Sequence, residues 1–265
     1  MTVAPYEPER FASTIPYYAT GRPAYANSLL ERLVRETRLG PSSRVLDLGC
    51  GPGSLTLPLS RLCGTIIAID PDRSMIETVG ASARSQGLSI DFRVGSSFDL
   101  GDDLAPLDLV TIGRAFHWMD REETLKRLDG LIAPSGAVAL VNTELHSLGD
   151  NRWHAVFEEI RKAHGRFDAF YRLRKSDDWE SHVSVLLRSP FADVVRISTF
   201  DERATDIEEI VARAFSFSAN SRSALGEDGS AAYEKEVRAR LMALEPTGQF
   251  PEIVETVAII ARRLA

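Results

Sequence analysis

The chain has 265 residues, of which 44% are hydrophobic and 26% are charged. This is ordinary globular usage, and it excludes a disordered chain, a disulfide-stabilised miniprotein and a collagen-like or coiled-coil structure. Lys and Arg number 31 against 38 Asp and Glu, a formal net charge of -7, which argues against a protein that coats nucleic acid, because phosphate neutralisation requires clustered cations.

The N-terminus and the cysteines indicate the compartment. Residues 1–10 contain no apolar stretch behind a basic start, so we expect no signal peptide, and no segment of the chain approaches transmembrane length. The two cysteines, Cys50 and Cys63, are expected to be reduced thiols, since Cys50 lies within a run of glycines. We therefore expect a cytoplasmic protein that engages neither membrane nor nucleic acid, and we expect a monomer or homodimer.

Five short apolar runs separated by helical patterns predict a mostly parallel sheet with crossover helices. The predicted strands are Arg44–Leu48, Thr65–Asp70, Ile90–Val94, Leu107–Gly113 and Gly136–Thr143. Apolar residues at helical spacing predict intervening helices at Leu55–Leu62, Ser74–Gln86 and Arg121–Leu131.

Beyond residue 145 the pattern changes to helices with two further strands. The predicted helices are Trp153–His164, Ile207–Phe217 and Ala231–Leu244, and the predicted strands are Asp193–Phe200 and Val254–Ala261. The segments 145–190 and 202–250 are therefore expected to be helical additions that form a lid over the carboxyl ends of the strands, where open α/β sheets bind ligands.

The strongest motif is an apolar strand that runs into a glycine loop before a helix, Val45-Leu46-Asp47-Leu48-Gly49-Cys50-Gly51-Pro52-Gly53. Glycine allows a sharp turn and a close approach of the backbone to a ligand. The next predicted strand ends in Asp70, where an acidic side chain accepts hydrogen bonds from ribose hydroxyls. The combination favours a nucleoside site over a simple tight turn with an exposed carboxylate.

Two departures separate this loop from a dinucleotide site. The pattern G-x-G-x-x-G requires glycine at position 54, where the chain has Ser54, and this disfavours an NAD-dependent dehydrogenase. Asp47 directly precedes the loop, and its carboxylate would repel a pyrophosphate but attract an ammonium group. A ligand with an adenosine half and an amino-acid half fits both features.

These residues resemble the cofactor site of class I S-adenosylmethionine-dependent methyltransferases. The segment Ala115-Phe116-His117-Trp118-Met119-Asp120 is similar to the A-x-H-W-x-D motif of the small-molecule branch that includes trans-aconitate methyltransferase-like proteins. Tyr18 to Tyr25, with Gly21-Arg22-Pro23, is similar to the Y-x-x-x-R-P-x-Y opening of that branch. The resemblance with specific motifs covers residues 11–143.

The resemblance implies a Rossmann-like, doubly wound α/β fold with a seven-stranded, mostly parallel sheet and helical lid insertions. It divides the chain into an N-terminal helical flap (1–40), a cofactor-binding core (41–145), and helical cap segments with the last two strands (146–265). It also implies methyl transfer from S-adenosylmethionine to a small molecule by in-line displacement. A catalytically inactive S-adenosylmethionine-binding regulatory protein is the alternative.

The resemblance also implies roles for individual residues. The residues expected to contact the cofactor are Arg22, Asp47, Gly49, Cys50, Gly51, Gly53, Asp70, Pro71, Met75, Ser96, Ser97, Phe98, Arg114 and Phe116. Asp70 would hold the ribose, and Pro71 and Met75 would border the adenine. The family often has G-D-A-E where this chain has Gly95-Ser96-Ser97-Phe98, so a serine hydroxyl or backbone groups replace the usual carboxylate contact, and Phe98 either stacks on the purine or packs beneath the sheet.

His117 is the candidate general base, because its ordinary pKa lies near neutrality and its loop faces the cofactor in this topology. The alternative is that His117 only hydrogen-bonds a backbone group and braces the loop. We expect Arg22 to reach the cofactor carboxylate or an acidic substrate, with Tyr17, Tyr18 and Tyr25 on the same wall. The alternative is that these tyrosines only anchor an N-terminal flap.

The sequence contains none of the motifs typical of other classes of reaction. There is no G-x-S-x-G elbow, no phosphate-binding G-x-x-x-x-G-K-[ST] loop and no close pair of His or Cys ligands, so we expect no metal. The N/D-P-P-F/Y signature of amide- and adenine-directed methyltransferases is replaced by Gly113-Arg114-Ala115-Phe116. This replacement argues against nucleic-acid bases as substrates.

Overall fold

The computed structural model describes residues 12–146 and 151–264, and it contains a seven-stranded sheet in the order β3-β2-β1-β4-β5-β7-β6. Strand β7 runs antiparallel to both of its neighbours, and the other strand pairs are parallel. The strands are β1 Arg44–Leu48, β2 Thr65–Asp70, β3 Asp91–Val94, β4 Leu107–Gly113, β5 Ile132–Leu145, β6 Asp193–Asp206 and β7 Gln249–Arg262. The predicted doubly wound, mostly parallel sheet is confirmed.

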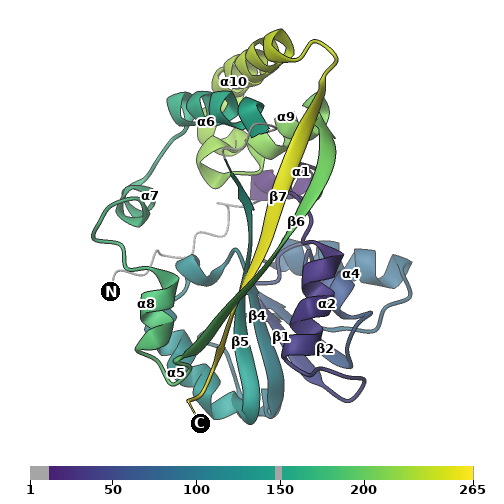
Figure 1. Cartoon of the computed structure of the whole chain (residues 1–265). Coiled ribbons are helices and arrows are strands. Elements are labelled where there is room, and N and C mark those ends of the chain that lie inside the picture. The colour runs from purple at the N-terminus through teal and green to yellow at the C-terminus, as the bar shows by residue number, and fades with distance from the viewer. Residues whose placement is uncertain (1–11, 147–150, 265) are drawn as a thin grey trace.

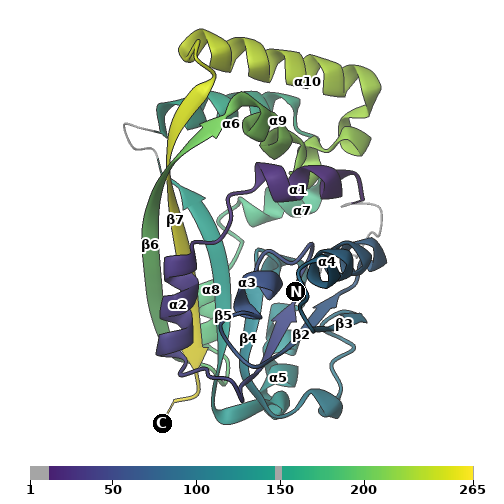
Figure 2. The same ribbon diagram turned by 90° about the vertical axis from the view of Figure 1, so that its right-hand side faces the viewer.

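Helices cover both faces of the sheet (Figures 1 and 2). The helices on one face are α2 Asn27–Glu36, α3 Thr56–Leu59 and α4 Arg73–Ser85, and those on the other are α5 Arg121–Leu131 and α8 His182–Leu187. Successive residues of a strand point to opposite faces. Val45 therefore belongs to the cluster with Leu30 of α2, whereas Leu46 belongs to the cluster with Leu125 of α5.

A second helical layer, which we call the cap, lies beyond the carboxyl ends of the central strands (Figure 2). The cap consists of α1 Ile15–Gly21, α6 Arg152–His164, α9 Ile207–Phe215 and α10 Arg222–Leu244. It has its own apolar core around Trp153, Phe157, Phe215 and Tyr233. The short helix α7 Ala169–Arg174 lies on the path from α6 to α8, between the cap and the sheet (Figure 1).

The cap is carried on the long strands β6 and β7, which pair with each other over 14 residues and extend well past the rest of the sheet. The predicted strands at Gly136–Thr143, Asp193–Phe200 and Val254–Ala261 were therefore too short. The predicted addition 202–250 begins in fact at Ile207, because residues 202–206 still pair with β7.

Among the predicted helices, α3 and α10 differ most from the sequence prediction. Helix α3 covers only four of the eight residues predicted, since the amides of Arg61 and Leu62 bond to carbonyls three residues back. Helix α10 starts at Arg222, nine residues before the predicted start, and changes direction at Gly226, whose φ is 71°.

The two helices of the predicted N-terminal flap have different locations. Helix α2 packs on the sheet, whereas α1 packs on α9 of the cap. A buried ion pair between Arg213 of α9 and Glu252 of β7, with N–O distances of 2.7 and 3.1 Å, secures this contact, because Arg213 Nε also donates to the carbonyl of Gly21 at 2.8 Å. A Cβ on Gly21 would lie 2.2 Å from the amide nitrogen of Arg213.

Candidate active site

The glycine loop after β1 is tied to the end of β2. The amides of Gly49 and Cys50 donate to the carbonyl of Ile69 at 2.8 and 3.1 Å. The amide of Gly51 donates to Asp70 Oδ2 at 2.8 Å, and the amide of Asp72 donates to Asp70 Oδ1 at 2.9 Å. Asp70 therefore shapes the loop with one lone pair on each oxygen, and the other lone pairs remain available to hydroxyl donors.

The three glycines of the loop have different surroundings. A Cβ on Gly49 would lie 2.6 Å from Ala115 Cβ, and a Cβ on Gly53 would lie 2.3 Å from Val79 Cγ2, so both glycines permit close packing. Gly51 has a φ of 54°, and a Cβ there would meet nothing within 4 Å. The backbone at Gly51 thus borders open space, as expected where a ligand approaches the main chain closely.

Asp47 lies below the glycine loop, fully buried. Its carboxylate accepts hydrogen bonds from Thr56 Oγ1 at 2.5 Å and from Thr111 Oγ1 at 3.0 Å, and burial raises its pKa to about 6. It borders a small cleft of about 30 Å³ together with Gly49, Gly51 and Arg114. Each carboxylate oxygen of Asp47 thus accepts one hydroxyl hydrogen bond.

The residues expected to surround the adenosine follow β2 and β3. Asp70 and Met75 are buried, and burial raises the pKa of Asp70 to about 6. Ser96 Oγ donates to Asp99 at 2.7 Å, and Phe98 is 51% exposed, which does not agree with packing beneath the sheet. Pro71 and Ser97 belong to the same loops, and Cys50 belongs to the glycine loop after β1; none of the three lines the large cavity described next.

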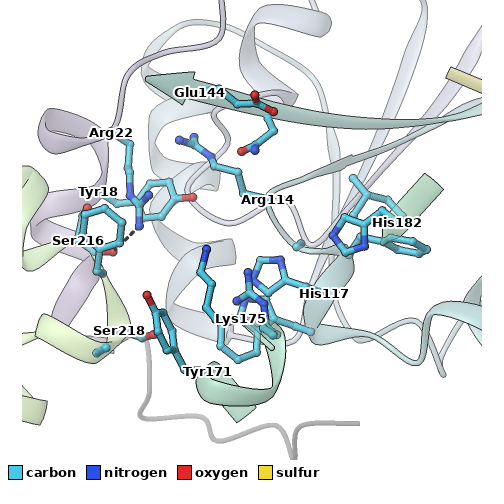
Figure 3. A pocket seen from close by; sticks show the side chains of 18 of the residues that line it. Tyr18, Arg22, Arg114, His117, Glu144, Tyr171, Lys175, His182, Ser216 and Ser218 are labelled. Atoms are coloured by element: carbon cyan, nitrogen blue, oxygen red, sulfur yellow. Dashed lines mark hydrogen bonds between the residues drawn. The ribbon is translucent and has the colours of Figure 1, made fainter. Parts of the chain in front are cut away.

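A cavity of about 720 Å³ lies between the strand ends and the cap, and we call it the large cavity (Figure 3). This volume suits a small-molecule site. It meets the cleft of the glycine loop at Tyr18 and Arg114, which line both. Of the predicted site residues, the structure brings Arg22, Arg114, Phe116 and His117 together on its wall.

His117 belongs to a 3-10 turn, Phe116–Trp118, after β4, and its ring faces the large cavity (Figure 3). Its ring nitrogens have no hydrogen-bond partner within the described residues, so a bond from His117 to the backbone does not brace the loop there. Burial, aided by the charge of Arg174, lowers the pKa of His117 well below 6.5. The imidazole is therefore neutral near pH 7 and competent to accept a proton.

His182, from α8, lines the cavity beside His117, with ring centroids 6.4 Å apart and ring planes 16° from parallel. Arg121 Nη1 lies 3.2 Å from His182 Nδ1. Because arginine only donates, Nδ1 accepts and Nε2 carries the proton of the neutral ring. Burial lowers the pKa of His182 to about 4, which keeps this second imidazole neutral as well.

Several cavity residues were not predicted from the sequence. Glu144, Lys175, His182, Ser216 and Ser218 line the cavity from β5, α7, α8 and the segment after α9. Nothing in their local sequence marks them, because they come from different additions to the sheet. Trp153, Phe157 and Phe215 do not line the cavity and instead belong to the core of the cap.

One group of potential metal ligands occurs among the described residues: Glu144, His146 and Glu255, whose ligand atoms lie within 4.8 Å of one another. Arg196 Nη2 lies 3.0 Å from Glu255 Oε1 and 3.8 Å from Glu144 Oε2. The guanidinium already supplies a positive charge to these carboxylates, so the group forms an ion-pair network.

Comparison with known proteins identifies related sequences. Residues 45–136 match the model of a family described as methyltransferase domain. An uncharacterized methyltransferase of Schizosaccharomyces pombe is 33% identical over 135 residues, 49% of this chain and 51% of the relative. A ubiquinone biosynthesis O-methyltransferase of Caulobacter sp. is 37% identical over 109 residues, 40% of this chain and 43% of the relative. The chain spans about half the length of the curated relatives it matches.

Solved structures share the fold. A type II methyltransferase structure from Anaeromyxobacter dehalogenans aligns with a TM-score of 0.61 at 20% identity, covering 91% of this chain and 97% of that one. An S-adenosylmethionine-dependent methyltransferase of Thiobacillus denitrificans, in complex with S-adenosylhomocysteine, aligns with a TM-score of 0.52 at 16% identity, covering 95% and 98%. Within the described residues, none of the helices has the length and apolar character needed to cross a bilayer.

Proposed function

We propose that this chain, whose residues 45–136 match a methyltransferase-domain family, transfers a methyl group from S-adenosylmethionine to a small-molecule acceptor held in the large cavity. The main support for the proposal is that the cleft at the glycine loop adjoins the large cavity. The glycine loop, open at Gly51, adjoins a cavity of about 720 Å³ that is lined by the imidazole of His117.

The residues at the junction fit the cofactor. Asp70 has free lone pairs for the ribose hydroxyls, and the open backbone at Gly51 accommodates the methionine portion. Arg114, on the wall of both spaces, offers a guanidinium to the single carboxylate of the cofactor. The buried charge of Asp47 favours the ammonium group, and the exposed ring of Phe98 is available to the purine.

S-adenosylmethionine supplies a methyl group bound to a positively charged sulfur, so the acceptor meets an already activated carbon. The chain then contributes orientation and the exclusion of water by the cap. His117 accepts a proton from the acceptor where the acceptor has one to lose, since its lowered pKa keeps the imidazole neutral. Acceptors that are already anionic need no base.

The proposal is tested by titrating the purified protein with S-adenosylhomocysteine and with NAD in a calorimeter, and by assaying transfer of label from [methyl-³H]S-adenosylmethionine to pooled small molecules. We expect saturable binding of S-adenosylhomocysteine, no binding of NAD, and labelled product from at least one pool. Binding of NAD alone would refute the proposal. Binding of S-adenosylhomocysteine without labelled product from any pool would support the regulatory alternative.

A further inference from the structure

The imidazole of His182 is held by a buried arginine that does not itself line the large cavity. Arg121, the first residue of α5, lies with its Nη1 3.2 Å from His182 Nδ1. The same Nη1 donates to the carbonyl of Glu180 at 2.7 Å, and the guanidinium lies 4.1 Å from the ring centroid of Trp179. The guanidinium of Arg121 is therefore fixed by the residues that directly precede α8, and it fixes the ring of His182 in turn.

The group that contacts Nδ1 decides what Nε2 of an imidazole offers. A carboxylate there accepts the proton of Nδ1, and Nε2 is then the free lone pair of a base. An arginine only donates, so Nδ1 of His182 supplies the lone pair and Nε2 carries the proton. Burial, with the charges of Arg121 and Arg174, lowers the pKa of His182 to about 4. His182 is thus a neutral hydrogen-bond donor near pH 7.

The other histidines outside the cavity wall have the opposite kind of partner. Each lies next to a carboxylate: His146 at 2.5 Å from Glu255, His164 at 2.7 Å from Glu236, and His154 at 4.0 Å from Glu158. The charged groups that act on His182 within the described residues are Arg121 and Arg174, and both are cations. The surroundings of His182 therefore favour a donor, whereas those of the other three favour a protonated or base form.

The N–H of His182 belongs to the wall of the large cavity. Figure 3 shows His182 and His117 on the same side of this space. The ring of His182 lies edge-on to Phe116, with centroids 5.2 Å apart, and nearly parallel to that of His117. Within the part of the chain that the structure describes, Nε2 of His182 has no hydrogen-bond partner. A polar group in such a half-buried place requires a partner from the cavity, either water or a ligand.

On the premise of the proposed function, we propose that Nε2–H of His182 donates a hydrogen bond to the methyl acceptor, and that Arg121 is the positioning residue that holds this tautomer. The bond falls on an atom other than the one methylated, because a donor there would occupy the lone pair that attacks the methyl carbon. His182 keeps its proton throughout and orients the acceptor. His117 takes the proton that the acceptor loses.

The first test is the tautomer of His182, which requires no acceptor. Protein labelled with ¹⁵N in its histidine rings and saturated with S-adenosylhomocysteine is examined by long-range ¹H–¹⁵N correlation between pH 5.5 and 8, and His182→Gln assigns the signals. We expect one neutral Nε2–H tautomer over this range. Arg121→Met retains an apolar contact with Trp179 and removes the donor. It should give a mixture of tautomers and a higher pKa of His182, because a nearby cation has been removed.

The second test measures transfer of label from S-adenosylmethionine to the pool of small molecules that yields labelled product. The pool is diluted until the rate is proportional to its concentration. His182→Leu should lower this rate by about fivefold or more, as expected for one lost hydrogen bond. His182→Gln, whose side-chain amide retains an N–H donor, should stay within about threefold of wild type, and Arg121→Met should fall between the two.

Two controls separate this role from a structural one. His164→Gln removes an imidazole that does not line the cavity and should leave the rate unchanged. Thermal denaturation and the affinity for S-adenosylhomocysteine, which should change less than about twofold, are measured for every variant. Loss of a merely structural histidine would lower the melting temperature and would not be rescued by glutamine.

Four results would overturn the proposal. They are an Nδ1–H tautomer in the wild type, a tautomer unchanged in Arg121→Met, a wild-type rate in His182→Leu, and equal losses of rate in His182→Leu and His182→Gln. Failure of the proposed function is distinct, because wild-type protein would then give no labelled product from any pool, before any variant is compared.

Discussion

At the scale of single residues, Asp70 links loop geometry to ligand binding. Its carboxylate holds the amides of Gly51 and Asp72, and burial raises its pKa to about 6, with the carboxylate of Asp72 adding to the shift. Ribose hydroxyls donate to the ionised form, so cofactor binding and protonation of Asp70 compete. The affinity for S-adenosylhomocysteine should therefore be constant above pH 7 and fall by about tenfold per pH unit below 6.

Calorimetry of Asp70→Asn between pH 5 and 8 checks this expectation. Asp70→Asn should bind S-adenosylhomocysteine about ten- to a hundredfold more weakly than wild type at pH 7.5. Its affinity should also fall less steeply at low pH, because one titrating carboxylate has been removed. Asp47→Asn identifies the contribution of the other buried carboxylate, whose pKa is also about 6. A pH dependence identical in wild type and Asp70→Asn would contradict the role given to Asp70.

Gly51 has a matched control elsewhere in the chain. Gly51 and Gly87 have similar positive φ values, 54° and 66°, and a Cβ on either would meet nothing within 4 Å. Alanine should destabilise both sites by a similar amount, about 1 kcal/mol, because the backbone strain is the same. Only Gly51→Ala should weaken the binding of S-adenosylhomocysteine, because only the alanine Cβ at position 51 would occupy the space of the ligand. Equal affinities of the two variants would remove Gly51 from the site.

His117 is tested through rate rather than affinity. If it is a general base, His117→Ala should lower turnover by roughly 10²- to 10⁴-fold and leave cofactor affinity nearly unchanged. Because its pKa is well below 6.5, the wild-type rate should show no loss of base function between pH 8 and 6.5. For an acceptor that must lose a proton, a His117→Ala turnover within a few fold of wild type would show that His117 is not the general base. For an acceptor that is already anionic, such a small loss of turnover is the expected result.

At the scale of elements, the buried part of each strand could be predicted from its apolar residues. The extensions of β6 and β7 beyond that part could not. Residues 202–206 read Glu-Arg-Ala-Thr-Asp, with no apolar alternation, and they are strand only because β7 pairs with them. Backbone pairing at this distance from the core leaves no hydrophobic signal in the sequence. Helix α5, which is bounded by Asp120 and packs its apolar side on the sheet, was predicted to the residue.

The candidate site also contains residues that could be predicted from the sequence and residues that could not. The glycine loop, Asp70 and His117 could be predicted because each follows a strand and carries a motif. His182 and Ser216 could not, since they lie 65 and 99 residues beyond His117 in the sequence and reach the same cavity only through the fold.

The attachment of α1 to the cap depends on Gly21. A Cβ there would lie 2.2 Å from the backbone of Arg213, so Gly21→Ala should displace α1 and with it Arg22. We expect a lower melting temperature and faster amide exchange in residues 15–21, with exchange in β1 and β4 unchanged. Gly40→Ala, where a Cβ meets nothing within 4 Å, is the control. Unchanged exchange in α1 of the Gly21→Ala variant would show that this contact does not hold the helix.

At the scale of the whole molecule, the cap and the sheet are joined by β6 and β7 and enclose the large cavity between them (Figures 1 and 2). We predict that residues 12–25 and the described parts of 145–190 gain protection from hydrogen exchange when S-adenosylhomocysteine binds, because closure excludes water from the cavity. The same prediction covers residues 1–11 and 147–150, which lie outside the described residues. Equal exchange with and without the ligand would speak against a lid.

A crystal structure of the protein with S-adenosylhomocysteine bound would test the proposed active site directly. We predict that the ribose hydroxyls lie on Asp70, that the carboxylate lies on Arg114, and that the sulfur faces the large cavity on the side of His117. A ligand whose sulfur faces away from the cavity, or whose adenosine lies elsewhere than at the end of β2, would contradict the proposed active site.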